Sequence, residues 1–381
     1  MNTALGNRIT PNGAQARRSH GRIASAFTLI ELLVVISVIA LLIGILMPAI
    51  GSARGAARQI VGASLHKQLS TAQLTYAYDH RGAYAGPNTS NIQYLARSVG
   101  GGSPLQFGSA ALLGNTTSTT PVSTHDWISP ILGDSMGFSE NRAERTADIF
   151  NNLACPAATR FNDLLFGDAE DLDDFEEVQN KRVFNQISFL SPMGFHYWPT
   201  HSGPAPRLPI SPAPGSMVQV GRYVGDSFNA PVEIADSFRR TVDAIATPSS
   251  KILVTDGCRY LDGDGVLDFD VDVDPGTYGS FLTSSPIFHG SRAFARPGST
   301  GTANLHPDSF KLSIRHGGFS SMNVSHFDGS VSRMTDEEAY TDPTPWFPAG
   351  SVFTGSGATP ESIEFMAQIS NETGESQPRL N

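Results

Sequence analysis

The chain has 381 residues, of which 40% are hydrophobic and 16% are charged, and its formal net charge is −10. This composition allows a sizeable core and excludes a chain that is disordered throughout. An acidic chain lacks the clustered Lys and Arg that nucleic acids require, so we expect no nucleic-acid partner.

An apolar run extends from Phe27 to about Met47 and is long enough to cross a membrane. Roughly twenty residues at about 1.5 Å each match a bilayer core of about 30 Å. Arginines and no acids precede the run, while the chain after it is acidic. The positive-inside bias therefore predicts a cytoplasmic segment 1–26 and export of the rest.

Glu31 places a carboxylate near the start of this run. An acid inside a bilayer costs at least about 2.5 kcal/mol and is usually paired or functional. A cleaved secretory signal does not fit, because the run is too long and the small residues precede it instead of following it. A buried core helix could have this composition, and an ordinary membrane anchor fits the length and the charge but leaves Glu31 unexplained.

The string Ala26-Phe27-Thr28-Leu29-Ile30-Glu31, followed by Leu-Leu-Val-Val-Ile, resembles the processing site of type IV pilins and type II secretion pseudopilins. The resemblance implies that prepilin peptidase cuts between Ala26 and Phe27 and that Phe27 becomes an N-methylated amino terminus. It also implies that Glu31 meets the amino terminus of a neighbouring subunit during assembly. The family usually has Gly where this chain has Ala26, and often carries a helix-kinking proline at the place of Pro48.

After Pro48 the apolar residues recur every three or four positions, which predicts that the helix continues as an amphipathic segment and ends near Gly82. The fold class is therefore α+β, a long N-terminal helix packed on a β-rich globular head, and the resemblance makes it pilin-like. The expected parts are a cleaved leader 1–26, a transmembrane helix 27–47, its amphipathic continuation 48–80, an exported head 81–347 and a mobile C-terminal tail 348–381.

Beyond the helix the chain has mainly strand and turn character. Lys251–Asp256 is a β-rich run, and Ser321–Phe327 alternates before Asp328-Gly329, a strong hairpin-turn signal. The acidic run Asp168–Glu177 is typical of a solvated helix face.

Cys155 and Cys258 are the two cysteines of the chain. They form either one disulfide or two separate buried thiols, and sequence does not decide between the two. Cys155 precedes Pro156 and has no recognisable active-site context, and no G-x-S-x-G, phosphate-loop or dinucleotide motif occurs. We therefore predict a protein that is not an enzyme.

Arg315-His316-Gly317-Gly318, followed by Asp328-Gly329, is similar to the His…Asp-Gly signature of a pseudopilin-like family with a processing-associated domain. One interpretation is a hairpin in which Asp328 and Gly329 form the turn while His316 makes a local hydrogen bond. The other is a metal pair or an acid–base pair of His316 and Asp328.

Asp262, Asp264 and Asp268 place oxygen ligands around two glycines, as a calcium loop requires. The EF-hand pattern fails at both ends of the loop, where Tyr260 and Val271 stand. The stretch is therefore either a calcium site of another kind or a solvated acidic turn.

These features predict a pilin-like structural subunit that is assembled into a type II secretion or type IV pilus filament. Its expected partners are prepilin peptidase, other pilin-like subunits, the inner-membrane assembly machinery and membrane lipid. The precursor would lie in the inner membrane with a cytoplasmic amino terminus, and the processed subunit in a periplasmic or surface filament. A second hypothesis is a membrane-tethered module that binds calcium or another ligand and never polymerises, and a third is an exported hydrolase on a pilin-like anchor.

Overall fold

The chain forms two compact units, Met1–Ala53 and Arg54–Asn381, in a computed structural model. The structure describes residues 28–86, 117–123, 125–158, 164–165, 172–182, 185–196, 207–209, 217–219, 231–235, 237–261, 263–264, 267–268, 281–298 and 305–381.

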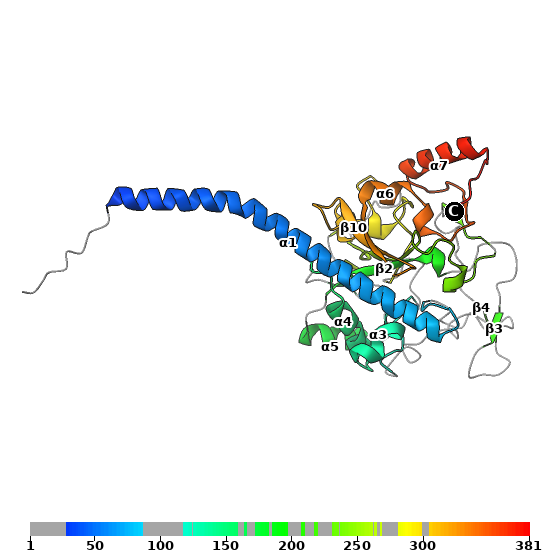
Figure 1. Ribbon diagram of the computed structural model, residues 1–381. Helices are drawn as coiled ribbons and strands as arrows, with labels where there is room; N and C mark the ends of the chain where they lie inside the picture. The colour runs from blue at the N-terminus through cyan, green and yellow to red at the C-terminus, as the bar shows by residue number, and fades with distance from the viewer. Residues whose placement is uncertain are drawn as a thin grey trace, which may run out of the picture. The chain divides into compact units, whose positions relative to one another are not determined.

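Helix α1 (Leu29–Asp79) has 51 residues and continues through Pro48 (Figure 1). Within the described residues it is the one helix that is long and apolar enough to cross a membrane. It ends where Gly82 adopts a left-handed conformation with φ +84° and donates its N–H to Ala77 O at 2.7 Å. Such a glycine satisfies the last carbonyls of a helix, so the predicted long helix and its stop are confirmed.

In the head unit, α1 buries one stripe of side chains. Gln73 shows how tightly this stripe is held, because its Nε2 donates to Ala85 O at 2.8 Å and its Oε1 accepts from Ala85 N at 3.0 Å. The chain that leaves the helix is therefore bound back onto it. The buried residues of the stripe are Gly62, His66, Leu69, Ser70, Gln73 and Ala77.

A five-stranded sheet forms the centre of the head, in the order β11-β10-β6-β2-β9. Neighbouring strands are antiparallel except β2 and β9, which are parallel. Every residue of β6 and β10 is buried, so both faces of the central strands are covered. This confirms the two strands expected from sequence. The bounds are β2 (Phe189–Pro192), β6 (Ile252–Asp256), β9 (Leu282–Thr283), β10 (Ser321–His326) and β11 (Val331–Thr335).

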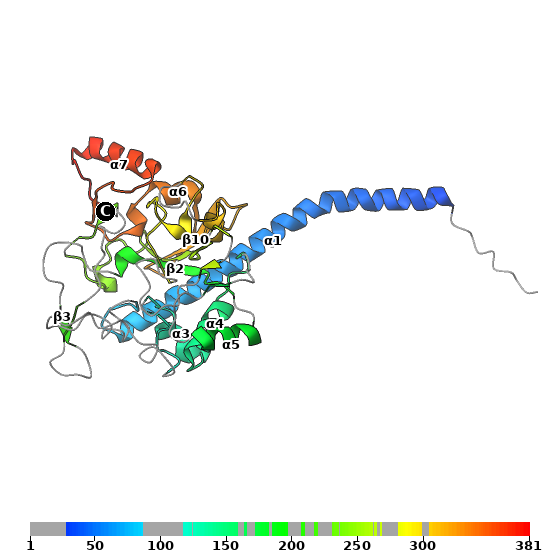
Figure 2. The ribbon, with the colours of Figure 1, turned by 180° about the vertical axis from the view of Figure 1, so that it is seen from behind.

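Helices gather at two opposite ends of the head, α3 to α5 at one and α6 with α7 at the other (Figure 1, Figure 2). The expectation of strand and turn is wrong for α3 and α4. In α4 the Asn141 side chain caps the helix by accepting from Glu144 N at 3.0 Å. Their bounds are α3 (Ser129–Met136), α4 (Arg142–Asn152), α5 (Leu172–Lys181), α6 (Asp336–Thr341) and α7 (Pro360–Thr373).

Helix α5 carries most of the acidic run. Phe175 and Val178 are buried on one side, while Asp173, Glu176 and Glu177 are exposed. The prediction of a solvated helix face is confirmed over Leu172–Glu177, and residues 168–171 lie outside the described part of the chain.

Short strands and 3₁₀ turns complete the head. A small sheet has the order β1 (Leu164–Leu165), β8 (Leu267–Asp268), β7 (Tyr260–Leu261). Two further pairs of strands are β3 (Arg207–Pro209) with β4 (Met217–Gln219), and β5 (Val232–Glu233) with β12 (Val352–Phe353). The 3₁₀ turns are Met193–Phe195, Val242–Ala244, Arg292–Phe294, Ser309–Leu312 and Thr344–Trp346.

The segment 348–381 is part of the folded head, so the predicted mobile tail is wrong. Strand β12 pairs with β5, and Met366 of α7 and Leu380 are only 2% and 1% exposed. Buried apolar side chains hold a segment in place because exposing them costs free energy. The fold is α+β as expected, with a head that mixes helices and strands.

Candidate functional site

The N-terminal end of α1 carries Glu31 in a reciprocal capping arrangement with Thr28. Glu31 Oε2 accepts from Thr28 N at 2.9 Å and from Thr28 Oγ1 at 2.8 Å, and Glu31 N donates to Thr28 Oγ1 at 3.3 Å. This pattern stabilises the start of a helix. The structure thus gives Glu31 a partner within its own chain, and Ala26 and Phe27 lie outside the described residues.

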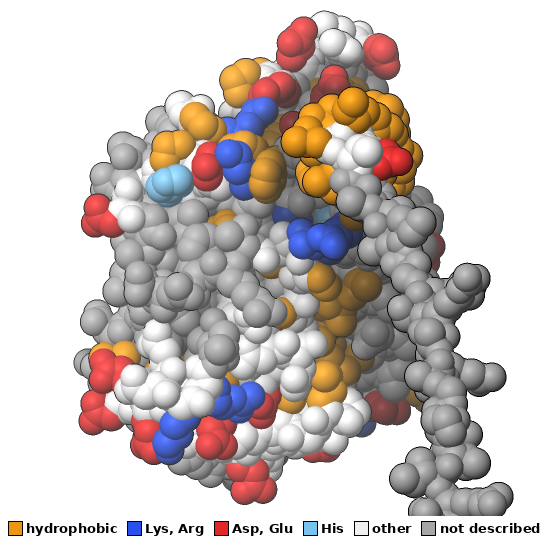
Figure 3. Space-filling view, turned by 90° about the vertical axis from the view of Figure 1, so that its left-hand side faces the viewer, with side chains coloured by type: hydrophobic (Ala, Val, Ile, Leu, Met, Phe, Trp, Pro, Cys, Tyr) orange, Lys and Arg blue, Asp and Glu red, His pale blue; other side chains and the backbone are white. Residues whose placement is uncertain are grey.

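The side chains that follow Glu31 are apolar and exposed on all sides of the helix (Figure 3). Across the segment 29–47 the exposed fractions of the large apolar side chains range from 46% at Val35 to 79% at Leu29. A helix that is apolar all round needs an apolar environment. The segment 29–47 therefore requires lipid or other helices around it.

A cluster of charged and polar groups is buried in the head, around Asp256 at the end of β6. Asp256 Oδ1 lies 3.2 Å from His66 Nε2 and 3.7 Å from Arg315 Nη2. Its Oδ2 lies 3.1 Å from His316 Nε2 and accepts from Asn323 N at 2.7 Å. The carboxylate is therefore held by groups from α1, from the loop before β10 and from β10 itself.

The groups of the cluster shift one another's pKa values. Burial alone would raise the pKa of Asp256, but Arg315, followed by the hydrogen bonds from His316 and His66, holds that pKa well below its usual range. Burial would likewise lower the pKa of His316, and hydrogen bonds with Asp256 and Cys155 raise it to about 9. Asp256 is thus an anion that faces two cationic side chains.

Cys155 brings a thiol to the same cluster. The ligand atoms of Cys155, Asp256 and His316 all lie within 4.8 Å of one another, and all three residues are buried. Cys155 also lines a cavity of about 210 Å³ with Ser188 and Gln186. The donor set of a thiol, a carboxylate and an imidazole is one that transition metals bind.

Cys155 and Cys258 do not form a disulfide, because both are free and buried. This matches the interpretation of two separate buried thiols. Sequence analysis missed the neighbours of Cys155, which come from distant parts of the chain. The one local signal was Asp256, a carboxylate directly after a buried β-rich run, where an unpaired charge is rare.

The Asp-Gly part of the signature forms the predicted hairpin turn between β10 and β11. Asp328 Oδ1 accepts from Ser330 N at 2.8 Å and from Ser330 Oγ at 2.6 Å, and Gly329 has φ +78°. His316 makes a local hydrogen bond with Asn323 Nδ2 at 3.2 Å, and its Nε2 also lies 3.1 Å from Asp256 Oδ2. Its acidic partner is therefore Asp256, and the alternative of a pair with Asp328 is wrong. The physical reason is that β10 lies beside β6, which brings His316 to the end of that strand.

The candidate calcium loop joins β7 to β8. Asp264 is an exposed turn residue, and Asp268 of β8 pairs through its backbone with Tyr260. Asp262 lies outside the described residues. Calcium binding by Asp262, Asp264 and Asp268 therefore stays a prediction.

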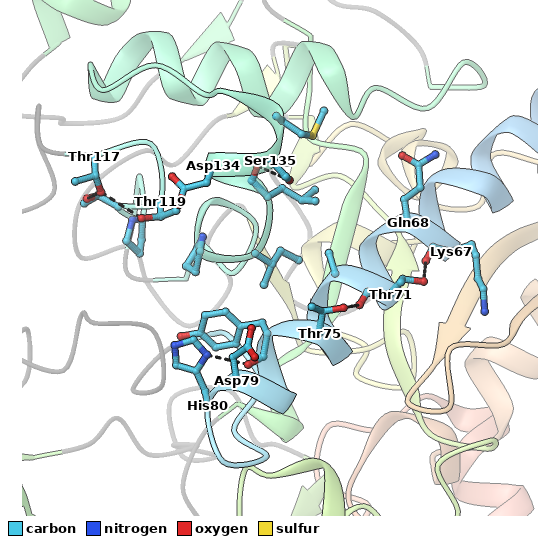
Figure 4. Close-up of a pocket in the computed structure, with 18 residues that line it drawn as sticks. Lys67, Gln68, Thr71, Thr75, Asp79, His80, Thr117, Thr119, Asp134 and Ser135 are labelled. Atoms are coloured by element: carbon cyan, nitrogen blue, oxygen red, sulfur yellow. Dashed lines mark hydrogen bonds between the residues drawn. The ribbon is translucent and has the colours of Figure 1, made fainter.

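A groove of about 970 Å³ runs between the second half of α1 and the segment that contains α3 (Figure 4). Thr71 and Thr75 line it, and their hydroxyls donate back to carbonyls of α1 at 2.8 and 2.9 Å. The threonine hydroxyls are therefore already bonded, and Lys67 donates to Gly329 O in the β10–β11 turn at 2.7 Å.

Comparisons with known proteins do not identify the chain, since no family model, no curated protein and no solved structure matches it.

Proposed function

We propose that this chain is a pilin-like structural subunit, processed at Ala26–Phe27 by prepilin peptidase and assembled into a filament of the type II secretion or type IV pilus kind. The observation that carries the proposal is α1, one helix that serves two environments. Residues 29–47 expose apolar side chains on every side, and the later part buries a single stripe in the head. Pilin-like subunits require such a helix.

The charge pattern supports an inner-membrane precursor with a cytoplasmic amino terminus. The segment before Phe27 contains arginines and no acid, whereas the head is acidic. Glu31 supports assembly, because an acid in lipid gains most from a cationic partner. Methylation would leave the amino group of Phe27 able to carry a positive charge, which makes it a suitable partner in a neighbouring subunit.

Mass spectrometry of the N-terminal peptide from native membranes tests the processing step. We expect a mature chain that begins at Phe27 and carries one added methyl group. An intact leader would overturn the proposal, as would cleavage far downstream of Glu31.

Crosslinking in membranes tests the assembly step. We expect Glu31→Gln to insert normally and to give fewer crosslinked oligomers, because the neighbouring amino group loses its counter-charge. Thr28→Ala is the matched control, since it removes the hydroxyl of the cap and keeps the charge. Processing is measured in the same samples, and equal losses in both variants would assign the effect to helix capping.

The groove beside α1 favours a second candidate, a tethered module that binds a ligand and does not polymerise. Its volume of about 970 Å³ suits a small molecule or a short peptide segment. Unchanged oligomer yield in Glu31→Gln membranes would favour this candidate over the filament subunit.

A further inference from the structure

Three metal-binding side chains converge from three separate segments of the head. Cys155 follows α4, Asp256 ends β6, and His316 precedes β10, and their ligand atoms lie within 4.8 Å of one another. A tetrahedral ion with bonds of about 2.0–2.3 Å holds its ligands about 3.3–3.8 Å apart. The upper limit of 4.8 Å in the cluster is about 1 Å beyond the longest of these distances.

The carboxylate and the imidazole of the cluster are in direct contact, because Asp256 Oδ2 lies 3.1 Å from His316 Nε2. Asn323 Nδ2 lies 3.2 Å from the same nitrogen, so this edge of the imidazole is held in place.

Gly62 lets the backbone of α1 approach this cluster closely. A Cβ at residue 62 would lie 3.2 Å from Cys155 Sγ and 3.6 Å from His316 Nε2. A glycine inside a helix weakens it, so the missing side chain is notable. The helix backbone therefore packs against two of the three donors, and Cys155 also lines the cavity of about 210 Å³.

A buried amide faces the same cavity. Gln186 is 3% exposed and lines the cavity with Cys155, and neither its Oε1 nor its Nε2 has a hydrogen-bond partner among the described residues. Buried amides are normally satisfied, so water or a ligand is expected next to Gln186.

We propose that Cys155, Asp256 and His316 bind one divalent transition-metal ion of the zinc class in the head. Thiol and imidazole donors select such ions over calcium and magnesium, which take oxygen ligands. Asn323 N and His66 hold the two carboxylate oxygens of Asp256, as supporting groups do around metal ligands.

Metal binding would release to solvent any protons that the ligand atoms of His316 and Cys155 carry, because a metal binds the deprotonated forms of these groups. Arg315 lies 3.7 Å from Asp256 beside the site. This site is independent of filament assembly, which depends on α1 outside the head.

Cobalt titration of the full chain tests the site. The chain is purified in detergent under reducing conditions and stripped with a chelator, and Co²⁺ is then added. We expect one equivalent to bind with a thiolate-to-cobalt charge-transfer band, and zinc to displace it. Absence of that band at one equivalent would overturn the proposal.

The two cysteines provide matched variants. Cys155→Ser should lose the charge-transfer band and bind zinc more than about 100-fold more weakly, because even supporting groups around a metal are worth about 10–100-fold. Cys258→Ser should keep both the band and the affinity. Equal behaviour of the two variants would overturn the assignment of Cys155.

Folding of the variants is checked by circular dichroism and by thermal melts. Zinc should raise the melting temperature of the wild type relative to chelator and leave that of Cys155→Ser unchanged. If Cys155→Ser does not fold, X-ray absorption of the zinc-loaded wild type decides: one sulfur ligand supports the site, and none overturns it.

Discussion

At the scale of single residues, His196 is a titratable group whose charge the fold suppresses. Its Nε2 lies 2.8 Å from Ser191 Oγ, and its ring meets Tyr84 edge-on with centroids 5.5 Å apart. Burial, and then the positive charge of Arg240, lowers the pKa of His196 to about 3 from 6.5. The ring is therefore neutral in the folded head at neutral pH.

We expect acid to destabilise the head through His196. The unfolded chain takes up a proton near pH 6.5, whereas the folded chain resists it until about pH 3. The contribution of neutral His196 to the free energy of unfolding is thus fully present above the pKa of the unfolded chain. It falls as the pH drops below that value, by up to about 1.4 kcal/mol per pH unit. Urea unfolding of His196→Gln should show a flatter loss of stability between about pH 6 and pH 4. A slope identical to that of the wild type would contradict the assignment.

Sequence predicted some residues of the site and missed their partners. The Asp-Gly pair predicted the turn at Asp328 and Gly329, because the positive φ of that turn suits glycine. The same motif located His316 but not its contact with Asp256, since that contact exists only because β10 pairs with β6. Local patterns contain no information about which strands become neighbours.

At the scale of elements, two glycines of α1 have opposite surroundings. A Cβ at Gly55 would meet nothing within 4 Å, whereas a Cβ at Gly62 would lie 3.1 Å from Asn323 Nδ2 and 3.2 Å from Cys155 Sγ. Distances of that kind force buried neighbours to move. A side chain in place of Gly55 would favour the helix and create no clash. A side chain in place of Gly62 would favour the helix but crowd the buried neighbours.

Replacement of these glycines should have opposite effects on the free energy of unfolding of the full chain in detergent. Gly55→Ala should raise it by about 0.5–1 kcal/mol, because alanine restricts the unfolded chain and favours helix. Gly62→Ala should lower it by about 1–3 kcal/mol through overpacking. Tryptophan fluorescence during urea unfolding measures both, and an equal gain in the two variants would show that the space at Gly62 is not constrained.

Helix α7 offers a matched pair of substitutions in the segment for which sequence predicts a mobile tail. Met366 is 2% exposed and Ile363 is 47% exposed on the same helix. Met366→Ala should cost about 2–5 kcal/mol of stability, because it removes buried atoms and leaves a cavity. Ile363→Ala should cost less than about 1 kcal/mol. Thermal melts compare the two variants. An unchanged melting temperature in both would support a mobile tail instead of a folded one.

The elements predicted correctly are those with strong local signals. Helix α1 has helical spacing and a terminal glycine, and β6 and the β10–β11 hairpin have β-rich runs with turn residues. Helices α3 and α4 were missed because they are short, and Asn141, which caps α4, also fits a turn. Helix α7 was missed although Ile363, Met366 and Ile369 recur every three residues, because the Gly-, Ser- and Pro-containing segment before it is typical of a loop.

At the scale of the whole molecule, the α+β class was predictable and the strand order was not. The order β11-β10-β6-β2-β9 joins strands between Phe189 and Thr335, with one parallel pair at the edge. Long-range pairing of this kind leaves no periodicity in sequence. The cluster of Cys155, Asp256 and His316 depends on that order, which is why it emerged only from the structure.

The attachment of α1 to the head also determines how the molecule would carry mechanical load. His66 with Asp256, Lys67 with Gly329 O, and Gln73 with Ala85 join the helix to the head at successive positions along its axis. A pull along the axis would stress these contacts together, in shear, instead of opening them one after another. Single-molecule pulling should therefore show one rupture of helix from head, and a staircase of small ruptures would show that the contacts yield separately. A chain with this attachment would transmit tension from its helix to its sheet with little extension.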